Sequence, residues 1–425
     1  MKFEFLHPRL DEGLEEAVGR LEASSRVRII SHSDGDGVFA AATAVSLAHE
    51  LGVNYHVTLL KHPDREAIAT LLEEGYDLYL IMDLGSASEA ADRKDVVILD
   101  HHQSPGEVRE ATLVNPTLYG ADGGSEVCAS SLAFLMALLL DRADLAPNFV
   151  AGCLADKQVP FRGINEKIYR LVEGSFRTRT WLNLVDLEVP VALTHSTEPY
   201  VRELAKGGKV EQLLSRLGIG SEQRVSELHE SKAKELASTL VPMLAIQGAS
   251  VEGMESVTAT EFVHDDVHVN TVSKMVHLVA RQDMGGEALA AVLEGRVVER
   301  LRDEYLEAEK ILISHIEASE VSDRGSFYLV ETREGAPAGR VAEVYLHYIL
   351  EARKPVVASS REGDRMKFSL RAAEGHNVNL GLSAREAASE AGGQGVGHPL
   401  AAGASVPLDR AEDFLRALAR RMSSS

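Results

Sequence analysis

The sequence predicts an α/β protein in which a doubly wound parallel sheet comes first, a mostly helical insert follows, and a smaller α/β domain comes last. Between residues 26 and 99, short apolar runs alternate with helical stretches, which is typical of parallel strands joined by right-handed helical crossovers. Residues 197–320 lack this alternation and are predicted to be mostly helical, and a second α/β pattern starts near residue 326. We therefore expect three parts, at residues 1–190, 191–322 and 323–425.

The first part contains the clearest elements. Apolar runs predict strands at residues 26–31, 54–60, 77–82 and 95–99. Helical periodicity predicts helices at residues 8–23, 38–51, 64–74, 86–92, 124–141 and 147–157. In a parallel sheet, ligands gather where the carboxyl ends of the strands meet. Ligand-binding residues are therefore expected directly after these strands.

The composition is that of a globular protein without a membrane anchor. Hydrophobic residues make up 45% of the 425 positions, and we find no apolar run of 18 residues. The first residues lack the apolar core of a signal peptide, and Cys128 and Cys153 lie in apolar helical patterns. We therefore expect a cytoplasmic protein with both thiols in its core. The net charge of −21 argues against broad electrostatic binding to duplex nucleic acid.

Three of the predicted strands end in acidic and histidine residues. Strand 26–31 is followed by His32, Asp34 and Asp36, strand 77–82 by Asp83, and strand 95–99 by Asp100, His101 and His102. A single aspartate after a strand is usually a helix cap or a turn former. Three such strand ends on one sheet edge favour a different explanation, because clustered carboxylates repel one another unless a cation neutralises them.

The helix predicted at residues 147–157 adds Asp156 to these candidates. On its own, Asp156 is as consistent with an exposed helix end as with a ligand. Carboxylates and imidazoles without thiolates suit Mn²⁺ or Mg²⁺ better than structural zinc. Six ligands are too many for one catalytic ion and about right for two ions that share a bridging carboxylate. Asp83, which stands alone at its strand end, is the natural bridging residue. Two such ions support in-line hydrolysis of a phosphoester or phosphoanhydride, and no Walker A or G-x-S-x-G motif competes.

The segment that follows residue 175 mixes basic and aromatic side chains. Arg177 and Arg179 alternate with Phe176 and Trp181. Such a pattern can stack bases and hold phosphates, although a packed connector with two surface arginines is the commoner outcome. We therefore predict a connector here and keep nucleic-acid binding as the alternative.

The predicted insert carries no catalytic motif. Its expected elements are helices at residues 210–217, 222–240, 271–283 and 296–319 and a β-like run at 255–263. His264, His268 and His277 are too scattered to predict a metal site, so we expect ordinary surface or core histidines.

The last part repeats the α/β pattern and holds the one basic stretch of the chain. Its expected elements are strands at residues 326–331, 355–359 and 366–371 and helices at 338–351, 383–391 and 408–421. Residues 392–403, Gly-Gly-Gln-Gly-Val-Gly-His-Pro-Leu-Ala-Ala-Gly, are predicted to be a loop whose backbone N–H groups approach an anion, with His398 as a further donor. Lys and Arg outnumber the acids between residues 353 and 371, which supports an anion site.

Taken in order, these motifs resemble the DHH/DHHA1 phosphoesterases. The resemblance rests on the Ser-His-Ser-Asp-Gly-Asp-Gly run at residues 31–37, the acidic and histidine residues that end the next strands, Asp156, and the glycine-rich segment. It covers about residues 25–160 and 326–421. It implies a DHH domain and a DHHA1 domain that face each other across a cleft, with two divalent ions, Mn²⁺ preferred and Mg²⁺ as the alternative.

The resemblance also implies roles for single residues. The ligands of one ion would be Asp34 and Asp83, with direct ligation by His32 left open because the His-x-Asp-x-Asp spacing is tighter than in other branches. The ligands of the other ion would be Asp36, Asp83, His101 and Asp156. Asp100 would support the ligands without binding an ion itself, and His102 would lie near the scissile phosphate. These two residues would form the catalytic pair. The substrate phosphate or terminal nucleotide would be held by Arg371, Gly395, Gly397 and His398.

The position of the insert separates the branches of this family. NanoRNases and cyclic-dinucleotide phosphodiesterases place their two domains close together in sequence, whereas residues 191–322 intervene here. This arrangement resembles the archaeal RecJ-like exonucleases, which are similar to the DHH-type subunit of the eukaryotic replicative helicase and associate with GINS. We therefore predict an exonuclease that releases mononucleotides from single-stranded DNA or RNA in replication or repair, with GINS and the replicative helicase as candidate partners. A nanoRNase-like or cyclic-dinucleotide phosphodiesterase and a catalytically weak scaffold that binds GINS are the alternatives.

Overall fold

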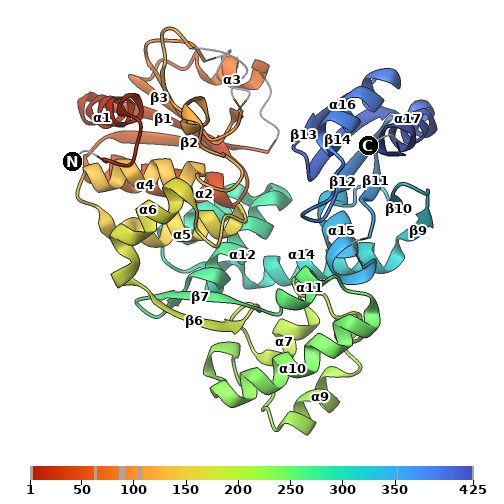
Figure 1. Cartoon of the computed structure of the whole chain (residues 1–425). Helices are drawn as coiled ribbons and strands as arrows, with labels where there is room; N and C mark the ends of the chain where they lie inside the picture. Colours follow the sequence, from red (N-terminus) through yellow and green to blue (C-terminus); the bar gives the residue numbers. More distant parts are fainter. Residues whose placement is uncertain (1–2, 62–64, 86–90, 104–107, 352, 424–425) are drawn as a thin grey trace. The chain divides into compact units, whose positions relative to one another are not determined.

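The computed structural model describes residues 3–61, 65–85, 91–103, 108–351 and 353–423 (Figure 1). The chain divides into two compact units. Unit 1 consists of Met1–Arg179 and Glu261–Tyr305, and unit 2 consists of Thr180–Thr260 and Leu306–Ser425. Residues of the predicted insert therefore belong to both units, and the division at 190 and 322 stays a prediction.

Unit 1 is built on a five-stranded parallel sheet in the order β2-β1-β3-β4-β5. Its strands are β1 (Arg26–His32), β2 (Asn54–Leu60), β3 (Leu78–Met82), β4 (Val96–Leu99) and β5 (Thr112–Val114). β3 and β4 are buried along their whole length, as expected for a parallel sheet covered on both faces. Because Ser31 pairs with Met82 and Met82 with Leu99, the ends of β1, β3 and β4 are level. The residues that follow these strands therefore meet at one edge.

The four strands predicted for this sheet are confirmed, each to within one residue at either end. The fifth strand, β5, was not predicted, because its three residues are too few to show a periodic pattern. The predicted helix at residues 86–92 lies mostly outside the described residues.

Helices of unit 1 pack against one another beside the sheet, as Figure 1 shows for α2, α4 and α5. The helices of this unit are α1 (Pro8–Ala23), α2 (Gly35–Glu50), α3 (Arg65–Leu71), α4 (Ala129–Leu139), α5 (Ala146–Ala155), α6 (Gly163–Val172), α12 (Val269–Val279) and α13 (Gly285–Leu293). Helix α2 is alanine-rich and buried on nearly all sides. It begins three residues before its predicted start at Val38, because the Asp34 side chain caps it by accepting a hydrogen bond from the Gly37 N–H at 3.1 Å.

Unit 2 contains a six-stranded mixed sheet in the order β13-β14-β12-β11-β10-β9. Its strands are β9 (Glu320–Asp323), β10 (Tyr328–Glu331), β11 (Val356–Glu362), β12 (Arg365–Arg371), β13 (Gln394–Gly397) and β14 (Ala401–Pro407). β10 and β11 pair in parallel, and the other neighbours pair antiparallel. The helices around it are α15 (Ala338–Val344), α16 (Leu380–Glu390) and α17 (Ala411–Ser423). Phe368 and Phe414 stack in its core with ring centroids 4.5 Å apart.

The glycine-rich segment at residues 392–403 is not the loop that we predicted. It forms most of an antiparallel hairpin of β13 and β14, which packs against α16. A Cβ at Gly395 would lie 2.4 Å from the Ala384 carbonyl oxygen, and one at Gly397, whose φ is 147°, would lie 2.4 Å from the Ala402 Cα. Glycine is therefore needed for close packing of the hairpin, and its abundance misled the prediction of a loop.

The remaining elements confirm that the middle of the sequence is mostly helical. They include α7 (Val189–Thr194), α8 (Arg202–Ala205), α9 (Val210–Leu217), α10 (Glu230–Gln247), α11 (Val251–Glu255) and α14 (Val297–Ala318). Helix α10 lies further along the chain than the predicted 222–240, because the His229 side chain caps its start and Gly248 ends it in a left-handed conformation. Among the described helices, none has both the length and the apolar character that a bilayer span requires.

A small sheet of β6 (Arg177–Leu182), β7 (Thr258–His264) and β8 (Val267–His268) holds the basic and aromatic segment. Arg179 pairs with Glu261 at 2.5 Å. Trp181 is buried, and its indole N–H donates to the Val225 carbonyl oxygen at 3.1 Å. An indole in this position cannot stack on a base, so the prediction of a packed connector is confirmed.

Candidate metal centre

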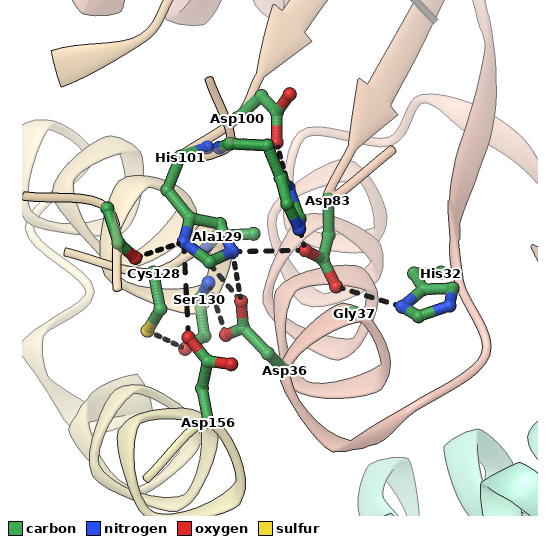
Figure 2. Close-up of polar contacts among 12 residues, drawn as sticks. His32, Asp36, Gly37, Asp83, Asp100, His101, Cys128, Ala129, Ser130 and Asp156 are labelled. Atoms are coloured by element: carbon green, nitrogen blue, oxygen red, sulfur yellow. Dashed lines mark hydrogen bonds and ion pairs between the residues drawn. The ribbon is translucent and has the colours of Figure 1, made fainter. Parts of the chain in front are cut away.

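The ends of β1, β3 and β4 and the end of α5 bring together the side chains that the sequence predicted as metal ligands. Figure 2 shows His32, Asp36, Asp83, His101 and Asp156 among them. Within each of three groups, one ligand atom per residue lies within 4.8 Å of the others. The groups are His32, Asp34 and Asp83; Asp36, His101 and Asp156; and Asp83, His101 and His102. All six predicted ligands therefore belong to one cluster, in which Asp83 and His101 link the groups.

Asp83 lies between two of these groups and presents one carboxylate oxygen to each. Its Oδ2 is 3.5 Å from the His32 Nδ1, and its Oδ1 is 3.2 Å from the His101 Nε2. Its backbone φ is 59°, a left-handed conformation that aspartate tolerates better than most residues. This strand end therefore offers a single carboxylate to two neighbouring positions.

His32 and Asp34 form the group at the end of β1. The His32 Nδ1 lies 3.1 Å from the Asp34 Oδ2. Burial acts to lower the pKa of His32, but Asp34 and Asp83 outweigh it and raise this pKa to about 10. Burial acts to raise the pKa of Asp34, but the hydrogen bond and charge of His32 hold it well below its usual range. In the metal-free protein, the His32 imidazolium therefore supplies the positive charge that two carboxylates require.

Asp36 is held by the first turn of α4. Its two oxygens accept hydrogen bonds from the backbone N–H groups of Ala129, at 2.7 Å, and of Ser130, at 2.9 Å, an arrangement typical of anions at helix N-termini. Gly152 of α5 permits this close packing, because a Cβ there would lie 1.9 Å from the Ser130 Oγ. Burial raises the pKa of Asp36, and repulsion from Asp83 adds to the effect.

His101 and Asp156 complete the second group, and a buried glutamine supports them. The His101 Nδ1 lies 2.7 Å from the Gly123 carbonyl oxygen, which leaves Nε2 facing Asp83. The Gln158 amide donates to the Asp156 Oδ2 at 2.7 Å and to the same Gly123 carbonyl at 3.0 Å. Burial raises the pKa of Asp156 to about 8, with its acidic neighbours adding to the rise and His101 opposing it.

The charge of this cluster fits hard divalent cations. Four carboxylates lie in the cluster, and burial works against the charge of each one: Asp34, Asp36, Asp83 and Asp156. Carboxylate and imidazole donors without a thiolate are the ligands that Mn²⁺ and Mg²⁺ prefer. The two cysteines do not join them: Cys128 and Cys153 are both buried, with their sulfur atoms 3.5 Å apart.

His102 lies beside the cluster with 43% of its side chain exposed. Its Nδ1 is 2.8 Å from the Asp100 Oδ1 and 3.9 Å from the Asp83 Oδ1. Asp100 is buried and also accepts a hydrogen bond from the His101 N–H at 2.9 Å. Gly85 gives the imidazole room, because a Cβ there would lie 2.7 Å from the His102 Cβ. Asp100 thus fixes the ring through Nδ1 and leaves Nε2 for a partner outside the cluster.

The residues predicted to bind substrate gather at one end of the unit 2 sheet. Arg371, the last residue of β12, pairs with Ala401, the first residue of β14. The His398 N–H donates to the Ala401 carbonyl oxygen at 2.8 Å and so closes the hairpin beyond Gly397. The Arg371 Nε lies 3.2 Å from the Glu343 Oε1. The sheet therefore brings Arg371 and the hairpin residues together, and their binding role stays a prediction.

The basic stretch at residues 353–371 is largely balanced by acids in the folded unit. Lys354 pairs with Asp323 at 2.7 Å, Lys367 pairs with Glu362, and Arg371 pairs with a glutamate of α15. Two of these acids come from outside the stretch, so a count along the sequence could not include them.

Sequence reasoning assigned no site residue to the region 197–320, yet α12 packs against α2 and α5. The Gly35 N–H, at the start of α2, points to the His277 Nδ1 at 3.4 Å. The Arg281 Nη1 lies 3.9 Å from the Asp34 Oδ2. No local pattern could have revealed these neighbours, because Gly35 and His277 are 242 positions apart.

Comparison with known proteins identifies the family. A model of the DHH family, N-terminal domain, matches residues 26–155, and a model of the DHHA1 domain matches residues 325–424. The chain belongs to the DHH/DHHA1 family. The DHH match spans the three strand ends of the metal centre and stops one residue before Asp156.

One protein is similar to this DHH/DHHA1 chain in sequence, and two solved structures are similar to it in fold. An uncharacterized protein of Methanocaldococcus jannaschii is 27% identical in an alignment 415 positions long that covers 92% of this chain and 91% of that one. CDC45 from Entamoeba histolytica is similar with a TM-score of 0.62 and 10% identity, over 97% of this chain and 98% of that one. RecJ from Thermus thermophilus, in complex with Mn²⁺, is similar with a TM-score of 0.53 and 18% identity, over 97% of this chain and 55% of that one. The chain thus has the DHH-family phosphoesterase fold and spans about half the length of that RecJ.

Proposed function

We propose that this protein is a two-metal phosphodiesterase that removes mononucleotides from an end of single-stranded DNA or RNA. The observation that carries the proposal is the position of Asp83, whose two oxygens face separate groups of ligands, 3.5 Å from His32 and 3.2 Å from His101. A shared carboxylate of this kind suits two ions about 3.5–4 Å apart. We favour Mn²⁺, with Mg²⁺ as the alternative.

The proposed ligand sets follow the two groups. His32, Asp34 and Asp83 would hold one ion, and Asp36, Asp83, His101 and Asp156 would hold the other. We include His32 because its Nδ1 lies within 3.5 Å of both Asp34 and Asp83. When bound, the ions would supply Lewis acidity at the phosphate and lower the pKa of the attacking water.

The chain's own residues would handle the leaving group. Asp100 holds the His102 ring through Nδ1 at 2.8 Å, so the outer Nε2 is free to donate a proton to the departing oxygen. An imidazole oriented by a buried carboxylate is a common arrangement for general acid–base catalysis. His102 is therefore our catalytic residue, and Asp100 is its positioning residue.

The substrate proposal combines charge with the fold. The net charge of −21 confines nucleic-acid binding to local sites, and the ends of a single strand require fewer phosphate contacts than a duplex. We propose that Arg371 and His398 with its glycines hold the terminal phosphate or nucleotide. GINS and the replicative helicase stay our proposed partners because the domain arrangement resembles that of the archaeal RecJ-like exonucleases.

An end-labelled digest tests this function. Matched single-stranded DNA and RNA, labelled at either end, are incubated with the purified protein and Mn²⁺ or Mg²⁺, with the duplex as the control. We expect metal-dependent release of labelled mononucleotides from the single strands, and the label gives the polarity. Cleavage of di- to tetranucleotides alone would replace this proposal with the nanoRNase-like function. Association with GINS without turnover would replace it with the scaffold function.

A further inference from the structure

A wide turn lies beside the metal centre in unit 1. Helix α12 ends at Val279 and is joined to α13 by a kinked turn, η6 (Ala280–Met284). Gln282 and Asp283 leave the helical conformation within this turn, and Asp283 has a φ of 63°. Non-glycine residues held in a left-handed conformation cluster at active sites and ligand sites.

The turn is fixed to the ends of β1 and β2. The Ser33 hydroxyl donates to the Ala280 carbonyl oxygen at 3.0 Å, and the Lys61 ammonium pairs with Asp283 at 2.9 Å. Gly285 packs against β1 and β2, because a Cβ there would lie 2.5 Å from the Ser33 Oγ and 3.0 Å from the Leu59 Cδ1. The turn is therefore held in a defined place next to Asp34.

Arg281 extends from this turn toward the metal centre. Its Nη1 lies 3.9 Å from the Asp34 Oδ2, a distance too long for a hydrogen bond, and 52% of its side chain is exposed. In the same unit, Arg142 by contrast donates two hydrogen bonds to the Asp144 carboxylate, at 2.7 and 2.6 Å. A guanidinium carries five N–H donors in a planar fork that suits a phosphate. Once Asp34 is neutralised by a cation, Arg281 has its donors available for a second anion.

A hollow of about 310 Å³ adjoins the turn. Its lining includes the apolar side chains of Leu59, Leu60 and Leu289. Lys61 and Asp283, the ion pair that anchors the turn, also line it. Gly286 also lines it, and a Cβ at this position would meet no atom within 4 Å. The size is at the lower end of ligand pockets, and a mostly apolar wall with a few polar groups suits a nucleoside whose phosphate lies outside the hollow, toward Arg281.

We propose that η6 and this hollow form a nucleotide subsite next to the metal centre, in which Arg281 binds a substrate phosphate and the hollow receives the adjoining nucleoside. The inference rests on the proposed function, because it assigns a further part of the same substrate strand. It makes Arg281 a substrate-binding residue that holds the strand in place beside the bound ions.

Arg281→Ala tests the subsite, with Arg170→Ala as the matched control. Arg170 is an exposed arginine of the same unit that pairs with Glu166 on one face of α6. We expect Arg281→Ala to weaken binding of a fluorescein-labelled, phosphorothioate-linked single strand by about 10- to 100-fold, the range for one charge-assisted hydrogen bond. Mn²⁺ affinity measured by calorimetry should stay within about twofold, and kcat/KM should fall mainly through KM. Arg281→Lys should restore part of the loss, because it keeps the charge without the fork.

Gly286→Leu tests the hollow separately, with Gly19→Leu as its control. Both glycines are helical, and a Cβ at either meets no atom within 4 Å, so both variants should fold. We expect weaker strand binding in Gly286→Leu alone.

The outcomes of these measurements separate the subsite from the proposed function. Equal strand affinity in wild type, Arg281→Ala and Gly286→Leu would overturn the subsite even if hydrolysis is present. Absence of metal-dependent hydrolysis in the wild type would overturn the proposed function. The binding measurement then decides the subsite by itself: a loss specific to Arg281→Ala supports it, and a wild type that binds no single strand overturns it.

Discussion

Asp83→Asn is expected to abolish metal-dependent hydrolysis and to leave the fold intact. Asparagine keeps the shape of the side chain and tolerates the left-handed backbone at this position, but it cannot offer an anionic oxygen to each ligand group. Loss of a single stabilising donor costs an enzyme about 10²–10³ in rate, and loss of the shared ligand weakens both ion positions. We therefore expect a fall in kcat of about 10³-fold or more, measured as initial rates on labelled single strands with Mn²⁺.

Asp141→Asn is the matched control for this variant. Asp141 is exposed and has a φ of 57°, so the same substitution is made in the same backbone conformation outside the cluster. It should retain wild-type rates. Both variants should unfold cooperatively in circular dichroism melts. If folded Asp83→Asn keeps activity to within about tenfold, a difference of about 1.4 kcal/mol, Asp83 does not bridge two ions.

Removing the metal with EDTA is expected to stop hydrolysis, and the affinity for Mn²⁺ is expected to rise steeply with pH. In the metal-free protein the pKa of Asp156 is about 8 and that of His32 about 10, so both are protonated at pH 7. Each must lose its proton to bind a cation, which adds about tenfold in affinity per pH unit below its pKa. The increase in Mn²⁺ affinity per pH unit should therefore be steepest below pH 8. Calorimetry at pH 6, 7 and 8 measures it.

The same two groups fix the sign of a stability change. Both pKa values lie above the ordinary values of 3.8 and 6.5, so the folded, metal-free protein binds these protons more tightly than the unfolded chain. Its free energy of unfolding should fall as pH rises from 6.5 to 8, where both groups contribute, and Mn²⁺ should reverse the loss. Asp156→Asn should remove one proton from the binding slope. An Mn²⁺ affinity that does not change between pH 6 and 8 would contradict these ligand assignments.

The strand-end residues of the metal centre were predictable from sequence because parallel strands bring their carboxyl ends to one edge. Asp83 and His101 meet across β3 and β4 for this reason alone. Asp156 was ambiguous, since nothing in an apolar helix tells which way its last residue faces. In the fold, the Gln158 amide donates a hydrogen bond to Asp156, whose Oδ2 lies 3.9 Å from the His101 Nδ1, and the ligand role of Asp156 stays a prediction.

Other features depend on contacts that no local pattern contains. Arg281 lies near Asp34 only because α12 packs against α2 and α5, which are far from it in the sequence. The glycines at residues 392–403 were predicted to form a loop. Glycine is needed there because a hairpin packs closely against α16, which is a tertiary contact. The acids that balance the basic stretch include Asp323, which the fold brings from outside that stretch.

A crystal structure with Mn²⁺, analysed by anomalous scattering, would locate the bound ions. We expect two anomalous peaks about 3.5–4 Å apart, both in contact with the Asp83 carboxylate. One peak should lie against Asp34 and the other against Asp36 and His101. A single peak, or peaks that Asp83 does not join, would contradict the two-metal assignment.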